Sequence, residues 1–269
     1  MVKRAHKGQV FLVDNEYLRR IAEAAAITAG ETVLEIGMGR GELTQHLVRR
    51  ARDVVAVELE ERLVDGAARD FGRCENLTIV HADILDVDWD ELIPEGRRVV
   101  VVGNVPFYIT GPILGWLLSH GRRIIRWSLL LQKEVAGRVC AAPGAKAYGA
   151  LSVKMQFRGE PYLAFDVPAE AFEPRPAVDA ALVCYRYYDD AGLPSEEAAL
   201  FDAFVDFTFA ARRKKIGNRL ATLLGGRLSA ADVAEIIRQK GFDPGARPER
   251  FSPREFAALY RTFAPYLDV

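Results

Sequence analysis

Short runs of β-branched residues alternate with helical patterns over the first two thirds of the chain, and no other feature restricts the fold as much. The expected strands, each followed by a polar or glycine-containing turn, are residues 32–36, 53–58, 77–81, 98–103 and 127–132. This alternation is typical of a parallel sheet with helices on both faces. We therefore predict an α/β fold with a doubly wound, Rossmann-like sheet.

Three further runs, residues 150–157, 162–167 and 180–187, have the pattern of strands but no full-length helices between them. They predict an antiparallel edge on the largely parallel sheet.

The end of the chain is helical after a segment of linker composition at residues 189–195. The helices expected from apolar periodicity are residues 196–211, 214–224, 230–240 and 253–263. We predict an α/β domain over residues 1–188 and a small all-helical domain over residues 189–269.

The composition argues against a membrane protein, a disulfide-bonded protein and a metal-binding protein. No run of eighteen apolar residues occurs, and the short basic start has no apolar stretch behind it. We therefore expect a cytoplasmic protein with no membrane partner. The cysteines Cys74, Cys140 and Cys184 are odd in number and lack a C-x-x-C pair, so neither a disulfide framework nor a metal site is expected.

The net charge of -1 excludes a uniformly basic nucleic-acid binder, so the distribution of charge carries more information than its sum. Between Ala203 and Arg227 the only acid is Asp206. The basic residues there are Arg212, Arg213, Lys214, Lys215, Arg219 and Arg227. Smaller basic clusters lie within residues 3–7, 49–52 and 122–126. Each cluster could bind phosphate or could simply be a solvated face.

Three successive strand ends carry residues suited to a nucleoside ligand, since open α/β sheets bind ligands beyond the carboxyl ends of their strands. Gly37 and Gly39 make a tight turn, which could approach a pyrophosphate or merely close a loop. Glu58 could accept hydrogen bonds from two ribose hydroxyls. Asp83 could receive an adenine amino group, or could cap a helix. The series favours S-adenosylmethionine over a dinucleotide.

The fourth strand end, Asn104-Val105-Pro106-Phe107, indicates the chemistry. The residue before a proline is held extended, so the Asn104 side-chain oxygen and the Val105 carbonyl can aim at one donor. Two acceptors on the hydrogens of an exocyclic adenine amine would favour an electron-rich nucleophile, and Phe107 would stack on the base. A proline turn closing an apolar strand is the alternative. No catalytic histidine is needed, because the proton can leave after methylation.

Several longer segments resemble one family, the ribosomal RNA small-subunit adenine dimethyltransferases and the related macrolide-resistance methyltransferases. The similar segments are residues 8–12 (GQVFL), 35–39 (EIGMG), 104–107 (NVPF), 131–136 (LQKEVA), 146–153 (KAYGALSV) and 171–179 (AFEPRPAVD). The family pattern has Asn or His at Val10, proline at Met38 and tyrosine at Phe107, so a contact from position 10 would be through the backbone.

The resemblance implies a role for particular residues. The S-adenosylmethionine site would be lined by Gln9, Val10, Leu12, Gly37, Gly39, Glu58, Asp83 and Asn104. Phe172 would be a second aromatic surface for the target adenine, opposite Phe107. The helical tail resembles the small-subunit branch, which implies RNA contacts by Arg212, Arg213, Lys214, Lys215 and Arg219.

The resulting hypothesis is N6-dimethylation of two adjacent adenines in a hairpin near the 3′ end of small-subunit RNA. The expected partner is a pre-30S-type particle and the expected state is a monomer. The alternatives are a large-subunit methyltransferase conferring antibiotic resistance and a non-catalytic RNA-binding assembly factor.

Overall fold

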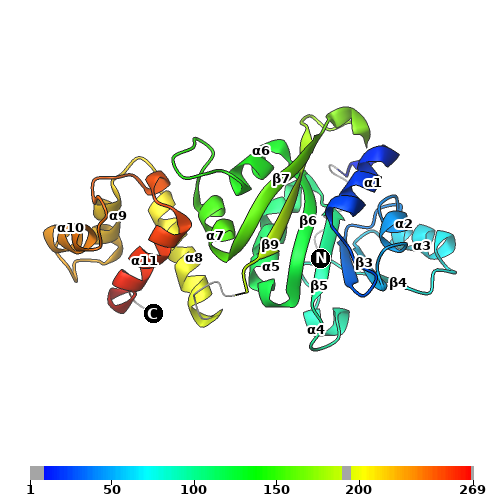
Figure 1. Cartoon of the computed structure of the whole chain (residues 1–269), viewed down its shortest axis with the longest axis horizontal. Coiled ribbons are helices and arrows are strands. Elements are labelled where there is room, and N and C mark those ends of the chain that lie inside the picture. Colours follow the sequence, from blue (N-terminus) through cyan, green and yellow to red (C-terminus); the bar gives the residue numbers. More distant parts are fainter. Residues whose placement is uncertain (1–8, 190–194, 268–269) are drawn as a thin grey trace. The chain divides into compact units, whose positions relative to one another are not determined.

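The computed structural model describes residues 9–189 and 195–267. The chain divides into two compact units, each made of two segments (Figure 1). Unit 1 comprises residues 1–136 and 161–187, and unit 2 comprises residues 137–160 and 188–269. None of the helices in the described ranges is long and apolar enough to cross a membrane.

The strands and helices of the described ranges follow in a regular order. The strands are β1 (Phe11–Leu12), β2 (Thr32–Ile36), β3 (Asp53–Glu58), β4 (Leu77–His81), β5 (Val99–Asn104), β6 (Ile124–Gln132), β7 (Gly159–Val167), β8 (Phe172–Glu173) and β9 (Ala180–Tyr187). The helices are α1 (Asn15–Ala24), α2 (Thr44–Leu47), α3 (Glu61–Asp70), α4 (Trp89–Leu92), α5 (Thr110–Ser119), α6 (Lys133–Val139), α7 (Ala150–Arg158), α8 (Ser195–Phe209), α9 (Ile216–Leu223), α10 (Ala230–Gln239) and α11 (Pro253–Phe263).

The main sheet has seven strands in the order β4-β3-β2-β5-β6-β9-β7. Strands β4, β3, β2, β5 and β6 are parallel, and β9 joins β6 antiparallel, so the predicted antiparallel edge is confirmed. The chain runs outward from β2 to β4 and then returns to place β5 on the other side of β2. This reversal makes the carboxyl ends of β2 and β5 a topological switch point, where doubly wound sheets bind ligands.

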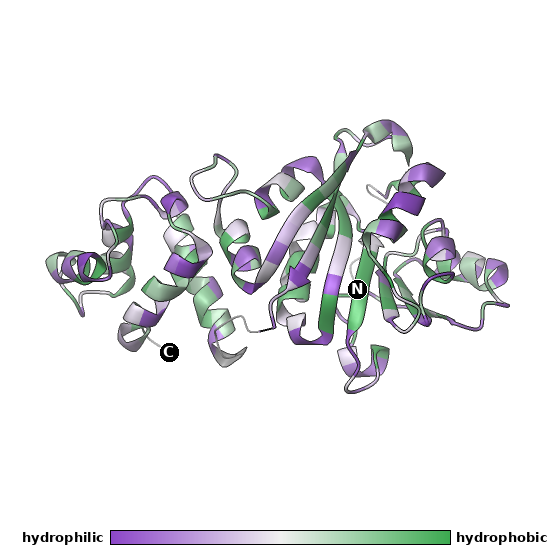
Figure 2. Ribbon diagram, in the orientation of Figure 1, coloured by the Kyte–Doolittle hydropathy of each residue, from purple (hydrophilic) through white to green (hydrophobic). Residues whose placement is uncertain are grey.

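The sheet is buried on both faces. One set of alternate side chains, including Val33 and Val100, packs with Leu18 and Ile21 of α1. The other set, including Leu34, Val99 and Val101, is also fully buried. Strand β5 is hydrophobic along most of its length (Figure 2). A near-continuous apolar strand of this kind is typical of a parallel sheet covered on both sides.

Residues 150–157 form a helix, so the prediction of a strand there is wrong. The sequence alternates apolar and polar residues with a period of two, which is why it resembles a strand. In α7 some polar side chains form hydrogen bonds within the protein. Gln156 donates to the carbonyls of Val139 and Ala141 at 2.9 and 2.8 Å. Ser152 donates to the carbonyl of Arg138. Burial around most of the helix removed the amphipathic signal on which the prediction relied.

Unit 2 has its own hydrophobic core. Tyr148 and Phe157 pack there with residues of α8, α9 and α11, and the Tyr148 hydroxyl donates to the carbonyl of Phe251 at 2.8 Å. Residues 137–160, which the sequence analysis placed in the first domain, thus pack with the C-terminal helices. The four C-terminal helices were predicted to within a few residues. Most of the predicted linker, residues 190–194, lies outside the described ranges.

Candidate active site

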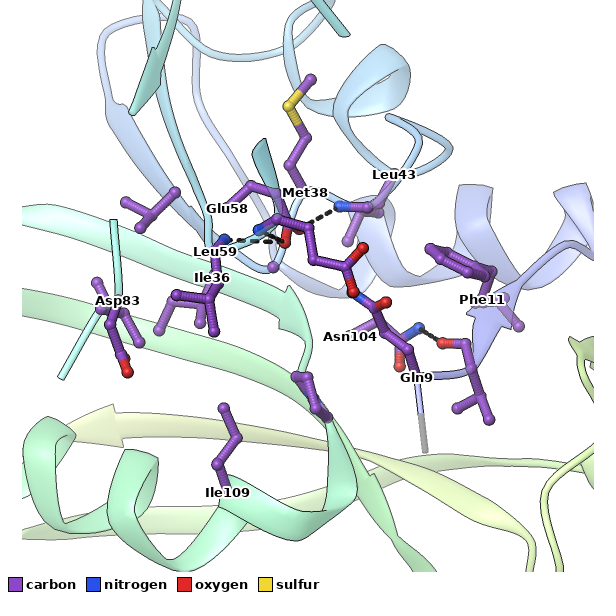
Figure 3. Close-up of a pocket in the computed structure, with 18 of the residues that line it drawn as sticks. Gln9, Phe11, Ile36, Met38, Leu43, Glu58, Leu59, Asp83, Asn104 and Ile109 are labelled. Carbon is purple, nitrogen blue, oxygen red and sulfur yellow. Dashed lines mark hydrogen bonds between the residues drawn. The ribbon is translucent and has the colours of Figure 1, made fainter. Parts of the chain in front are cut away.

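A pocket in unit 1 lies at the carboxyl ends of β2, β3, β4 and β5 (Figure 3). All the predicted cofactor-binding residues line it, namely Gln9, Val10, Leu12, Gly37, Gly39, Glu58, Asp83 and Asn104. The lining also includes residues that the sequence analysis did not single out for this site, among them Phe11, Met38, Glu42, Leu59, Glu60, Ile84, Leu85, Tyr108 and Ile109.

The turn after β2 has a backbone that only glycine adopts readily. Gly37, Gly39 and Gly41 have φ angles of 76°, 60° and 89°. The Gly37 N–H donates to the carbonyl of Val57 at 2.9 Å, which joins the turn to the end of β3. A Cβ on Gly39 would lie 3.3 Å from the ring of Phe11. The turn therefore brings bare backbone to the pocket wall.

Glu58 ends β3 and its carboxylate is held by the backbone. Its Oε2 accepts the N–H of Gly39 at 2.9 Å, and its Oε1 accepts the N–H groups of Leu59 and Glu60 at 2.8 and 2.9 Å. The side chain is buried, with 4% of its surface exposed. These bonds fix the carboxylate at the pocket wall and use both lone pairs of Oε1, whereas Oε2 keeps a second lone pair for a ligand hydroxyl.

Asp83 follows β4 and lies in a turn, so it does not cap a helix as the alternative interpretation proposed. Its Oδ1 accepts the N–H of Leu85 at 3.0 Å, and α4 begins only after its own cap, Asp88. The close-up shows Asp83 on the side of the pocket away from Phe11, with Glu58 between them (Figure 3).

Asn104 has one half of its amide paired and the other unpaired. Its Nδ2 donates to the carbonyl of Val10 at 3.3 Å, while the buried Oδ1 has no hydrogen-bond partner. A buried acceptor without a partner costs about 1–3 kcal/mol, so such an atom indicates a ligand donor. The Val10 side chain plays no part in this contact, which uses the backbone carbonyl.

The segment that contains Val10 is held over the pocket by a small second sheet. Strand β1 pairs antiparallel with β8, with Phe11 opposite Glu173 and Leu12 opposite Phe172. The guanidinium of Arg40 lies 4.3 Å from the centre of the Phe11 ring. Two-residue strands carry too little pattern to be read from sequence, so this pairing was not predicted.

The aromatic residues proposed for base stacking lie together but outside the pocket lining. The rings of Phe107 and Phe172 are 6.5 Å apart and meet edge to face at 66°. Phe172 is 4% exposed, and Phe107 is partly buried. The two rings do not face one another across a gap, so in this conformation a base could stack on Phe107 but not between both rings. Val105 is buried, with 1% of its surface exposed.

Glu35 lies directly before the glycine turn and is fully buried. Its Oε2 accepts the hydroxyl of Thr44 at 2.7 Å, and its Oε1 has no hydrogen-bond partner. Burial raises the pKa of this carboxyl from 4.5 to about 8, and the nearby carboxylates of Glu58 and Glu42 act in the same direction. Burial therefore favours the protonated form of Glu35.

The basic clusters differ in what their side chains contact. Arg212 pairs with Glu249 at 3.4 Å and donates to the carbonyl of Lys146, and Arg219 lies over the Phe207 ring and donates to its carbonyl. Arg213, Lys214 and Lys215 are exposed and form no ion pair with a described acid. Of the five predicted RNA-binding residues, these three present their charge on the surface.

Two arginines of the cluster at residues 122–126 have partners within unit 1. Arg126 pairs with Glu31 at 2.7 Å and donates to the carbonyls of Ala25 and Ala26. Arg123 pairs with Asp90 at 2.7 Å. The cluster at residues 122–126 thus contributes mainly structure, and residues 3–7 lie outside the described ranges. Among the described residues, no group of three His, Cys, Asp or Glu side chains could hold a metal ion.

The sheet order and the pocket at its switch point define the class of protein. The fold is the Rossmann-like fold of S-adenosylmethionine-dependent methyltransferases, followed by C-terminal helices. It is similar to a dimethyladenosine transferase from Plasmodium falciparum, with a TM-score of 0.83 over 95% of this chain and 98% of that one, at 21% identity. It is also similar to the 23S rRNA methyltransferase ErmE, with a TM-score of 0.75 over 94% of this chain and 99% of that one, at 26% identity.

The chain belongs to the ribosomal RNA adenine dimethylase family, whose family model matches residues 2–240. Curated relatives named ribosomal RNA small subunit methyltransferase A share 38% identity with it. The protein from Latilactobacillus sakei aligns over 94% of this chain and 86% of its own length. The protein from Moorella thermoacetica aligns over 97% of this chain and 93% of its own length. The resemblance seen in the motifs is thereby confirmed.

Proposed function

We propose that this chain transfers methyl groups from S-adenosylmethionine to the N6 amines of two adjacent adenines near the 3′ end of small-subunit ribosomal RNA. The observation that carries the proposal is the buried, unpaired Oδ1 of Asn104 at the end of β5. It is an acceptor in a pocket whose other strand ends carry a glycine turn and two carboxylates. The relatives named above as small-subunit methyltransferases support this choice of RNA.

The residues present fit S-adenosylmethionine. Glu58 would accept the ribose hydroxyls, Asp83 the adenine amino group, and the turn at Gly37 and Gly39 would admit the chain that bears the sulfonium. When bound, this cofactor supplies an electrophilic methyl group. Gln9, Val10 and Leu12 would close the pocket over it, held in place by the pairing of β1 with β8.

Asn104 would act on the adenine amine. Its Oδ1 would accept one amine hydrogen, and the Val105 carbonyl would accept the other. Both acceptors stabilise the positive charge that develops on the nitrogen, and they are in place before the reaction. The hydrogen bond from Asn104 Nδ2 to Val10 orients the amide so that the oxygen, which is the catalytic atom, faces the substrate. Phe107 would stack on the adenine.

Unit 2 would bind the RNA through Arg213, Lys214 and Lys215. The target adenines must leave their stack to reach the pocket, which is easiest in a hairpin loop. We further propose that the substrate is a pre-30S-type particle, that the enzyme acts as a monomer, and that it works in the cytoplasm, where such particles are assembled.

The test compares ribosomal RNA from a strain that lacks the gene with RNA from its parent. Primer extension should show that two adjacent methylation stops near the 3′ end of the small-subunit RNA are lost in the deletion strain. Loss of a stop in large-subunit RNA would instead support a resistance methyltransferase. Unchanged stops in both RNAs would refute the proposed activity and favour a non-catalytic assembly factor.

A further inference from the structure

The pocket in unit 1 is strongly acidic. Four of its lining residues are acids, namely Glu42, Glu58, Glu60 and Asp83, and no described lining residue is basic. A site of this composition suits a ligand that carries positive charge.

Three of the four acids already have protein partners. Glu58 accepts backbone N–H groups, Glu60 pairs with Arg62 at 3.1 Å, and Asp83 accepts the N–H of Leu85. The carboxylate of Glu42 forms no hydrogen bond or ion pair within the described part of the chain, although its backbone carbonyl accepts from Gln45. Glu42 is thus the pocket acid whose charge is least compensated.

Glu42 lies at the Phe11 end of the pocket. A Cβ placed on Gly39 would lie 3.3 Å from the Phe11 ring and 3.7 Å from Oε2 of Glu42, so the ring and the carboxylate flank the same point of the glycine turn. Asp83 lies on the side of the pocket away from Phe11, with Glu58 between them (Figure 3). Glu42, Glu58 and Asp83 therefore follow one another in this order across the pocket.

We propose that Glu42 binds the α-ammonium group of the methionine part of S-adenosylmethionine. This inference rests on the proposed function, in which Asp83 and Glu58 take the adenine and the ribose. The amino-acid end of the cofactor then extends toward the glycine turn, where Glu42 attracts the ammonium group and repels the neighbouring carboxylate. Glu42 therefore sets which way the amino-acid end is turned.

The test is a double cycle of binding measurements on the full chain by calorimetry. The ligands are S-adenosylhomocysteine and its desamino analogue, and the proteins are the wild type and Glu42→Gln. Wild type should bind S-adenosylhomocysteine about tenfold more tightly than the analogue, as expected for a charge-assisted hydrogen bond. In Glu42→Gln the two affinities should be nearly equal. General damage to the pocket would lower the affinity for both ligands, so it would cancel in the ratio of the two affinities.

An unchanged ratio in Glu42→Gln overturns the inference while leaving the proposed function intact. S-adenosylmethionine is measured as a third ligand, and a loss of its affinity in Glu42→Gln with no loss for S-adenosylhomocysteine also overturns the inference, because the carboxylate would then act on the sulfonium. A wild-type chain that binds neither compound refutes the proposed function itself. Glu95→Gln removes an exposed carboxylate outside the pocket lining and should leave the ratio at its wild-type value.

Discussion

Unit 1 and unit 2 use their polar groups differently. In unit 1, Asn104 and Glu35 each keep a buried oxygen without a partner beside the glycine turn. Among the described residues of unit 2, the buried carboxylate oxygens that lack a hydrogen bond belong to ion pairs, since Asp202 lies 2.9 Å from Arg158 and Glu249 lies 3.4 Å from Arg212. Arg213, Lys214 and Lys215 are exposed on unit 2 and form no ion pair with a described acid. The difference indicates that the pocket of unit 1 is built to complete its hydrogen bonds with a ligand, whereas the exposed charge of unit 2 can attract a polyanion.

The largest effect is expected from Asn104→Ala, which should separate the chemistry of unit 1 from RNA binding by unit 2. We expect methyl transfer to small subunits to fall by about 10²–10³-fold, the usual cost of losing one preorganised acceptor or donor at a reacting group. RNA binding, measured by filter retention, should stay within about twofold of wild type because unit 2 is unchanged. The matched control is Asn218→Ala, at an exposed position on α9, which should lose neither methyl transfer nor RNA binding. Equal loss of both properties would mean that the tetrapeptide is structural.

The second test is directed at the interior of unit 2. Arg158→Met leaves Asp202 buried without its partner, and burial already raises the pKa of Asp202. We expect the free energy of unfolding in urea to fall by about 3 kcal/mol.

Adding Asp202→Leu to Arg158→Met should restore most of this stability, because a buried apolar pair replaces the ion pair at little cost. S-adenosylhomocysteine binding should remain in the single variant. A single variant as stable as wild type would show that the ion pair does not hold unit 2 together.

The third test concerns Glu35 and depends on pH. The unfolded chain loses this proton near pH 4.5, whereas the folded chain keeps it until about pH 8. Stability therefore falls as pH rises between these two values. Glu35→Gln should be increasingly more stable than wild type over this window, by roughly 1.4 kcal/mol for each pH unit at most. Thermal unfolding at several pH values measures this, and a difference that does not vary with pH would contradict it.

The smallest effect is expected from replacing Arg213, Lys214 and Lys215 with serine. Affinity for small subunits should fall about tenfold at low salt, and the dependence of binding on salt should become less steep by roughly two phosphate contacts. Turnover at saturating substrate should not change. Serine at the exposed Arg69 and Arg73 of unit 1 is the control. An unchanged salt dependence would place the RNA-binding surface elsewhere.

The sequence predicted unit 1 better than unit 2, for physical reasons. The strands at β2, β3 and β4 match the prediction to the residue, because each is a short run rich in β-branched residues that is followed by a turn. The residues at their ends could be assigned to one pocket because the carboxyl ends of parallel strands meet at the same edge.

Other features could not be predicted because they depend on distant contacts. Helix α7 is buried among the C-terminal helices, so its period-two pattern suggested a strand. The pairing of Leu12 with Phe172 joins residues that are far apart in the chain and form only two-residue strands. Glu42 follows the glycine turn in sequence, but only the folded turn shows that its carboxylate lies beside the pocket and has no hydrogen-bond or ion-pair partner among the described residues.

Methyl transfer by this chain to adenine in small-subunit RNA can be measured in a single assay. The full chain is incubated with S-adenosylmethionine carrying a labelled methyl group and with small or large subunits that lack the modification. Nucleoside mass analysis of the labelled RNA follows. We predict label in small-subunit RNA only, recovered as N6,N6-dimethyladenosine. No label in small-subunit RNA, or label confined to large-subunit RNA, would contradict the account.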